Sequence, residues 1–422
     1  MSSTEFSLYA ERANLASAIV SGAGVLARME AAISATRARF IDEARRAFVV
    51  TEHTVAGPSR SEWSIDEAAQ RMLVAELACE LNLPESTVQT QIVDSRLLVE
   101  DLHATLDALS RGDISWRHAH VLADHTGSLP ASARAAFEEK VLPYALTHTA
   151  TRFNRYARAQ RERLHPETIE ERHETAVDKR SVSIQPGADG MAWLTAHLPA
   201  PTAHAIFDRI TDAAHEASRA GDDRTIEQLR ADTFAQALLG STYSASEVLG
   251  APDLCTILST IRPTVQITVP ILTLLSRGDE PATLEGYGPI SIETASLLAS
   301  NAPNFMRLLT HPETGAVLSV GRDRYQIPAD LRHWLRVRDG TCRFPGCGRT
   351  ALRCDVDHTD EWQHGGGTEH SNLAHLCRKH HRLKSLTDWK VENLGNGQLR
   401  WTSPLGKIYV TEPEEGGVRG AA

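Results

Sequence analysis

The chain has 422 residues, 41% of them hydrophobic and 23% charged, a composition typical of a globular protein with two or three domains. Its formal net charge of −10 gives no indication that the chain as a whole binds nucleic acid. Residues 1–12 carry Glu5 and Glu11 and lack the apolar segment of a signal peptide, and the most apolar run, residues 265–275, is too short to span a bilayer. We therefore expect a cytoplasmic protein without membrane contact.

Periodic apolar residues predict a mostly helical region over residues 1–179. Two such series carry the prediction: Ala68, Met72, Ala75, Leu77 and Cys79, and then Leu97, Val99, Leu102, Leu106 and Leu109. Ser64 is placed to cap a helix over Ile65–Leu81, and Ser132 to cap one over 133–142.

The pattern changes after residue 179 and predicts a mixed α/β part of the same domain over residues 180–329. A β-hairpin is expected from 182–184 and 192–196, because they flank Pro-Gly and Asp-Gly turns. Two helices (202–220 and 225–239), a strand (264–269), a short helix (291–298) and a second hairpin (307–309 with 317–320) follow. Residues 412–422 are predicted to be a disordered tail.

Arg152, Arg155, Arg158 and Arg161 recur at every third position of a predicted helix. Such a stripe could contact phosphates. Four glutamates follow closely, however, so a solvated helix face is the favoured interpretation.

Positive charge is concentrated in the last quarter of the chain. Residues 332–390 hold eleven Lys or Arg against seven Asp or Glu, a local balance of +4, whereas the rest of the chain carries −14. A basic segment on an acidic body is the pattern expected when only that segment meets phosphate.

Four of the six cysteines lie in the same segment, interleaved with histidines, which indicates a metal site rather than a disulfide framework. Cys342 and Cys347 flank a Pro-Gly turn, and Cys377 with His380 would share one face of a helix. These four form a ligand set suited to a closed, tetrahedral zinc site. Helical spacing alone equally permits His381 in place of His380. Cys354 could replace one ligand, whereas Cys79 and Cys255 are isolated and are expected to be core residues.

A second group of residues suggests hydrolytic chemistry. Asp357 and His358 end a predicted strand over residues 353–357, and His381 lies about 100° around the helix from His380. An acid and two imidazoles around one cavity would suit a hard divalent cation. A neutral histidine can take a proton from water near pH 7, and the cation can stabilise the charge that develops on a phosphodiester.

With the cysteine pairs around them, Asp357-His358, Asn372 and His381 resemble the His-Asn-His (HNH) nuclease motif in its zinc-bound, McrA-like form. Much of residues 180–410 resembles the bacterial 13E12-repeat HNH endonucleases, which have a long N-terminal domain of unknown function. The stretches that carry this likeness include Arg230-Ala-Asp, Gly286-Tyr-Gly-Pro-Ile, Gly321-Arg-Asp-Arg-Tyr, Cys342 to Lys384, and Trp401-Thr-Ser-Pro-Leu-Gly.

The resemblance implies an α+β protein: a mostly helical N-terminal region, a mixed α/β middle region, and an HNH nuclease domain over residues 330–411. That domain would be a zinc-stapled ββα-metal module, with a hairpin from about Leu352 across Gly365 to Gly367, then a helix over 373–385.

The resemblance also implies roles for individual residues. His358 would activate water, Asn372 would hold the His358 loop, and Asp357 with His381 would bind a catalytic Mg²⁺ or another divalent cation such as Mn²⁺ or Ni²⁺. Structural zinc would be bound by Cys342, Cys347, Cys377 and His380. DNA phosphates would be contacted by Lys379, Arg382 and Lys384.

Three functions follow as expectations. The first is a metal-dependent HNH endonuclease that hydrolyses phosphodiester bonds in DNA. The second is a zinc-dependent DNA-binding module without cleavage, and the third is a partner-binding protein in which the N-terminal domain is the working part. The complete set Asp357, His358, Asn372 and His381 favours the first, because a pure DNA binder does not need all four.

Overall fold

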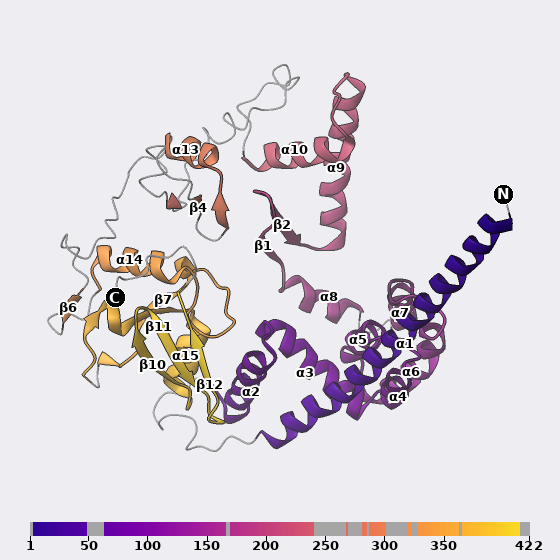
Figure 1. The fold of residues 1–422 in the computed structure, drawn as a ribbon, viewed down its shortest axis with the longest axis horizontal. Helices are drawn as coiled ribbons and strands as arrows, with labels where there is room; N and C mark the ends of the chain where they lie inside the picture. Colours follow the sequence, from indigo (N-terminus) through magenta and orange to yellow (C-terminus); the bar gives the residue numbers. More distant parts are fainter. Residues whose placement is uncertain are drawn as a thin grey trace. The chain divides into compact units, whose positions relative to one another are not determined.

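The computed structural model describes residues 3–48, 63–165, 169–239, 267–268, 281–284, 287–300, 319–321, 327–362 and 365–413. The fold is α+β, with a mostly helical N-terminal half and small sheets towards the C-terminus, as predicted (Figure 1). The chain forms two compact units. The first comprises Met1–Arg172, Ser319–Gln326 and Thr341–Glu412, and the second His173–Leu318, Ile327–Gly340 and Pro413–Ala422. Cys255, residues 307–309 and the predicted tail after residue 413 lie outside the described residues.

The first unit begins with helices α1 (Ser3–Ala47), α2 (Ile65–Leu81), α3 (Glu85–Glu100), α4 (His103–Arg111), α5 (Trp116–Gly127), α6 (Ala131–Ala145) and α7 (Ala150–Leu164). The prediction for α2 is confirmed, since Ser64 accepts a hydrogen bond from the backbone N–H of Glu67. The predicted cap at Ser132 is wrong. Helix α6 already begins at Ala131, because Pro130 supplies the extended residue before the helix.

Small residues allow the long helix α1 to pack closely on α3 and α4. Ala31, Ala35 and Ala38 are buried in the helical core. At Gly112, which ends α4 with φ of +77°, an added Cβ would lie 2.6 Å from the Cβ of Arg28. Only glycine satisfies both the backbone conformation and this close approach.

The opposite face of α1 is exposed and apolar. Its exposed side chains are Leu15, Ile19, Leu26, Met29, Ile33 and Phe40. Among the described residues, Arg12–Ala47 is the one helical stretch long and apolar enough to cross a bilayer by length and composition, a test that core helices of soluble proteins also pass.

The second unit contains a β-hairpin, two helices and a small sheet. Strands β1 (Ser181–Pro186) and β2 (Ala192–His197) pair antiparallel, which confirms the first predicted hairpin. Helices α9 (Ala200–Arg219) and α10 (Ile226–Leu239) follow, within two residues of their predicted bounds. The remaining elements are β3 (Ile267–Thr268), β4 (Ala282–Leu284), β5 (Gly288–Ile290), α13 (Ile292–Ser300) and α14 (Ala329–Asp339), while α8 (Ile169–Val177) crosses the division between the units.

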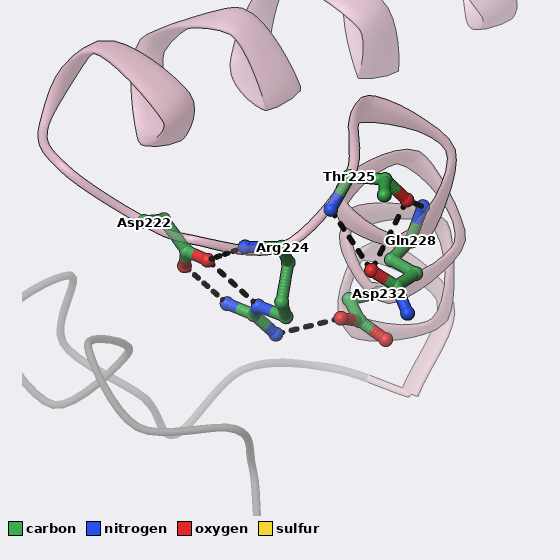
Figure 2. Close-up of polar contacts among 5 residues, drawn as sticks. All are labelled: Asp222, Arg224, Thr225, Gln228 and Asp232. Atoms are coloured by element: carbon green, nitrogen blue, oxygen red, sulfur yellow. Dashed lines mark hydrogen bonds and ion pairs between the residues drawn. The ribbon is translucent and has the colours of Figure 1, made fainter.

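A polar clip fixes the turn between α9 and α10 (Figure 2). The Arg224 guanidinium donates to both oxygens of Asp222, at 3.0 and 2.6 Å, and to Asp232 on α10 at 2.6 Å. These bonds lower the pKa of Asp222 to about 2. Thr225 and Gln228 complete the start of α10 by reciprocal side-chain capping.

The C-terminal part of the first unit is built from short strands around one helix. Strand β7 (Asp355–His358) pairs with β9 (Leu373–Leu376), and β6 (Ser319–Gly321) pairs with β8 (Thr368–Glu369). Helix α15 (Arg378–Leu386) precedes a three-stranded sheet of β10 (Lys390–Gly395), β11 (Gln398–Thr402) and β12 (Ile408–Thr411). Short 3₁₀ turns cover Ala351–Arg353 and His370–Asn372.

The predicted helix over 373–385 is wrong at its start. Residues Leu373–Leu376 are a strand whose four side chains are all buried. A short, continuously buried strand has no two-residue alternation, so its sequence cannot be distinguished from the first turn of a buried helix. The predicted strand over 353–357 is also shifted. It runs over Asp355–His358, because Arg353 belongs to the preceding 3₁₀ turn.

The C-terminal elements share a hydrophobic core with helix α2. Phe344 packs edge-on against Trp389 and Trp401, with ring centroids 5.0 and 5.1 Å apart. Met72 and Ala75 of α2 belong to the same buried cluster. The helical part and the cysteine-bearing part of the first unit are therefore one packed body.

His120 and Asp94 make the helical part sensitive to pH. Asp94 on α3 is buried, and its carboxylate lies 2.6 Å from Nδ1 of His120 on α5. This hydrogen bond raises the pKa of His120, and burial raises the pKa of Asp94. Because the folded pKa of His120 is raised, the stabilisation from its pairing with Asp94 is fully present below the unfolded pKa of His120 and is lost as the pH rises through the folded pKa.

We expect His120→Gln to lower the stability of the chain by up to about 1 kcal/mol at pH 6, and by less at pH 9. The measurement is chemical denaturation of wild type and variant at each pH. His103→Gln, which changes an exposed histidine of α4, is the control and should show a gap that does not vary with pH. A His120→Gln gap that stayed constant or widened towards pH 9 would contradict the prediction.

Candidate metal centre and catalytic pocket

Cys342, Cys347, Cys377 and His380 converge, with their ligand atoms all within 4.8 Å of one another. The turn after Phe344 brings the first two thiols together, and Gly346 supports it with φ of +72°. Cys377 is the N-cap of α15, and His380 lies in the first turn of that helix. Local chain geometry thus presents two ligands from a turn and two from a helix start.

The spacing of these atoms fits a tetrahedral cation. Nδ1 of His380 lies 3.4 Å from Sγ of Cys342 and 3.3 Å from Sγ of Cys377. Zinc–sulfur and zinc–nitrogen bonds at a tetrahedral angle would separate nitrogen from sulfur by about 3.6 Å. The cluster could therefore hold a metal ion such as zinc. His380 faces these thiols, and His381 does not belong to the cluster.

The thiols of the cluster differ in protonation, since the pKa is raised for Cys342 and Cys347 and lowered for Cys377. Hydrogen bonds from the neighbouring thiols of Cys342 and Cys347 lower the pKa of Cys377 far below its usual value. Although burial opposes it, hydrogen bonding to Cys347, Cys377 and Glu85 raises the pKa of His380 to about 11. A bound metal would take over the charge balance that the His380 proton provides.

The other described cysteines lie outside this cluster. The Cys354 thiol is 3.3 Å from the carbonyl of Thr350, so it packs beside the cluster without entering it. Cys79 on α2 is partly buried, and burial raises its pKa to about 12. Cys79 thus has an environment that suits packing rather than metal binding, whereas the thiol of Cys354 contacts that of Cys342 in the cluster.

Helix α15 presents a second site one residue further on. Nε2 of His381 lies 3.2 Å from Oδ1 of Asp357, and Nζ of Lys384 lies 2.7 Å from Oδ2. These two cationic partners lower the pKa of Asp357 although burial acts to raise it. The predicted pair Asp357 and His381 is thus brought together, and Lys384 neutralises the carboxylate.

His358 lies on the other side of strand β7, because successive strand residues alternate faces. The expectation of one cavity lined by Asp357, His358 and His381 is therefore not met, since the lining of the hollow that contains His381 does not include His358. Its Nε2 is 3.1 Å from Oγ1 of Thr368, and its ring centroid is 6.0 Å from that of Trp362. Burial lowers the pKa of His358, and the nearby Lys384 ammonium lowers it further. The Lys384 ammonium also donates a hydrogen bond to the backbone carbonyl of His358, so Lys384 contacts both Asp357 and His358. Thr368 has no motif signal and only the folded structure reveals its position.

Asn372 holds the chain that follows His358. Its Oδ1 accepts hydrogen bonds from Thr359 Oγ1 at 2.7 Å and from the Asp360 N–H at 2.8 Å. Its Nδ2 donates to the carbonyls of Asp360 and Gly367, at 3.0 and 2.9 Å. A Cβ on Gly366 would lie 1.9 Å from the Asp360 carbonyl, so this crossing requires glycine.

Two open hollows lie beside the candidate site residues described above. One, of about 530 Å³, is lined by Thr359, Asp360, Glu361, Gly365, Gly366, Lys384, Trp389, Lys390 and Val391. The other, of about 420 Å³, is lined by Asp355, Arg378, His381 and Arg382. Each hollow is lined by both acidic and basic side chains.

The three predicted phosphate contacts have different environments. Lys384 is 7% exposed and is committed to Asp357, Lys379 forms a 2.8 Å ion pair with Glu85, and Arg382 lies over the Trp63 ring. Arg378 is exposed at the rim of the second hollow. The exposed position of Arg378 at the start of α15 could have been found by extending the same helical reasoning one turn earlier.

Replacing Asn372 by Ala should remove four hydrogen bonds and leave buried backbone groups without partners, lowering stability by about 2–4 kcal/mol. Thermal denaturation and amide hydrogen exchange of residues 359–367 would measure this effect. Asn393→Ala, in the outer strand β10, is the control and should leave exchange at residues 359–367 unchanged. Unaltered exchange there in Asn372→Ala would show that Asn372 does not hold this segment.

Most of the chain is similar to proteins of unknown function. Residues 34–339 match the family described as "Domain of unknown function (DUF222)", so the match ends three residues before Cys342. The chain is 28% identical to the uncharacterized protein Rv2100 of Mycobacterium tuberculosis (strain ATCC 25618 / H37Rv) over 94% of its own length and 78% of that protein. It is also 28% identical to the uncharacterized protein Rv3776 of the same strain, over 92% and 78%. No solved structure gives a significant match.

Proposed function

The chain belongs to the DUF222 family, and we propose that beyond the matched region it carries a metal-dependent HNH endonuclease module that hydrolyses phosphodiester bonds in DNA. The observation that carries this proposal is that two adjacent histidines of helix α15 face different groups. His380 faces three thiols, whereas His381, the next residue, meets the buried carboxylate of Asp357. A site that only binds structural zinc does not require the contact between His381 and Asp357.

The cluster of Cys342, Cys347, Cys377 and His380 would bind structural zinc. Three sulfurs and one imidazole form a closed ligand set with no position left for a substrate. Such a site stabilises the turn and the start of α15 between which it is formed. The zinc would therefore position the reactive residues without taking part in the reaction.

The proposed catalytic residues lie at the end of β7 and on α15. Asp357 and His381 would bind a divalent cation, which supplies the Lewis acidity that stabilises charge on the phosphate and the leaving oxygen. Since Lys384 already pairs with Oδ2 of Asp357, Oδ1 is the oxygen that faces this site. The lowered pKa of His358 keeps its imidazole neutral near pH 7, as a general base that takes a proton from water must be. Asn372 and Thr368 would hold the His358 segment in place.

DNA contact is proposed at the rim of the second hollow. Arg378 and Arg382 line it together with His381, so their guanidinium groups could bind phosphates beside the catalytic cation. Lys379 and Lys384 would contribute positive potential rather than direct contacts, because each already holds a carboxylate.

One observation favours a zinc-dependent DNA-binding module without cleavage as the second candidate. His358 is only 6% exposed, and a general base must reach a water molecule. The two candidates differ in one measurable property, which is metal-dependent strand cutting.

Incubation of the full chain with supercoiled plasmid and Mg²⁺, Mn²⁺ or Ni²⁺ should give nicked or linear DNA. His358→Ala should lower the rate by about 10²–10⁴-fold, the contribution of a positioned general base. His103→Ala, at an exposed position of α4, should cut at the wild-type rate.

Equal cutting by wild type and His358→Ala would remove His358 from the mechanism. No cutting with any metal, together with DNA binding that weakens as salt rises, would replace the nuclease by the DNA-binding candidate.

Purified wild type should contain about one zinc ion per chain. Cys347→Ser should lose most of this zinc and unfold at lower temperature, because the cluster then lacks one thiolate. Cys354→Ser, which changes the thiol beside the cluster, should keep its zinc. The readouts are elemental analysis and thermal denaturation, and zinc loss in Cys354→Ser rather than Cys347→Ser would reverse the assignment of these two cysteines.

A further inference from the structure

Glu85 connects the helical region to the metal centre. It is the first residue of α3, within the residues that match the DUF222 family. Its Oε2 lies 3.0 Å from Nε2 of His380, although the two residues are 295 positions apart in the sequence. Nδ1 of His380 faces the thiols at the same time, so the imidazole bridges the thiol cluster and a carboxylate from the family domain.

This arrangement is typical of metal-binding histidines. A ligand imidazole commonly donates its distal N–H to a carboxylate, which fixes the tautomer and orientation of the ring and strengthens the ligand nitrogen. Here Nδ1 is the nitrogen that would bind the metal and Nε2–H is the group that would donate to Glu85. The ring also stacks on Phe344 at a centroid distance of 4.1 Å, so both its plane and its rotation are determined.

A simpler interpretation is that Glu85 serves only the helix start and a surface ion pair with Lys379. Acidic residues are favourable in the first helical turn, and the Lys379 ammonium is 2.8 Å away. Both roles would be met by an exposed carboxylate, however. The side chain of Glu85 is only 17% exposed, and its Oε1 is buried with no partner among the described residues. Burial of a carboxylate is costly, and here Oε2, shared by His380 and Lys379, provides the compensating contacts.

Packing of the neighbouring helix α2 supports the position of Glu85. Helix α2, which immediately precedes it, packs Met72 and Ala75 into the cluster that contains Cys342 and Cys377. Glu76 of the same helix accepts a buried 2.7 Å hydrogen bond from Ser403. The position of Glu85 relative to His380 is thus fixed by packing as well as by its own hydrogen bond.

We propose that Glu85 is the positioning residue of the metal ligand His380, so that the metal centre is completed by the DUF222 domain rather than by the C-terminal module alone. This inference rests on the metal centre proposed above. It assigns the helical region a defined task, which is to orient one ligand and slow the loss of the ion.

The test is the release of zinc from the full chain to an excess of a chromophoric chelator. Removing an outer partner of a metal ligand typically weakens binding 10–100-fold, so Glu85→Ala should release zinc about 10–100 times faster than wild type. Glu85→Gln retains an acceptor oxygen but no charge, and should show an intermediate rate.

Glu80 provides a matched control. It is a carboxylate of α2 that also forms an ion pair with the C-terminal part, to Lys407 at 2.7 Å, but it lies outside the cluster. Glu80→Ala should release zinc at the wild-type rate. Lys379→Ala tests the simpler interpretation, because it removes the ion pair and leaves the contact from Glu85 to His380; it should also retain zinc.

A spectroscopic readout separates positioning from a general loss of stability. In the Co²⁺-substituted protein, Glu85→Gln should shift the ligand-field absorption, because the orientation of His380 changes, whereas Glu80→Gln should not. Equal release rates and spectra for the Glu85 and Glu80 variants would overturn the inference while leaving the metal centre intact. A wild-type chain that binds neither Zn²⁺ nor Co²⁺ would overturn both.

Discussion

The rotation of helix α15 is the constraint on which the rest of the site depends. Cys377 is the N-cap residue of α15, and residues three and four positions later point in directions about 100° apart because an α-helix has 3.6 residues per turn. His380 meets the thiols and the carboxylate of Glu85, while His381 meets Asp357. A shift of one residue in this register would exchange the two histidines, so the residue at which α15 begins and the burial of Leu383 determine which histidine faces the thiols.

Packing extends this constraint into the helical region. The aromatic cluster of Phe344, Trp389 and Trp401 would be a small core by itself, and small cores stabilise a fold only marginally. Met72 and Ala75 enlarge it from α2. The end of the family match at residue 339 is thus a boundary in sequence, whereas the hydrophobic core of the first unit continues across it.

The sequence predicted those parts of the fold and the site that depend on local spacing. The cap at Ser64, the β1–β2 hairpin and the grouping of three cysteines with a histidine each follow from residues close together in the chain. Strand β9 was predicted as helix because its continuous burial hides the periodicity. Thr368, Lys384 as a partner of Asp357, and Glu85 could not be assigned, since their contacts depend on strand pairing and packing across up to 295 positions.

The thiol cluster and the surroundings of Asp357 also differ in how their buried charge is balanced. At the thiol cluster the negative charge is shared among sulfurs and balanced through His380, whose other nitrogen is held by a second anion. At Asp357 the carboxylate pairs with Lys384 and with His381, and the carboxylate of Asp355 also acts on His381. A divalent cation proposed to bind there would compete with Lys384 for the carboxylate oxygens, whereas an ion at the thiol cluster would replace the proton on His380.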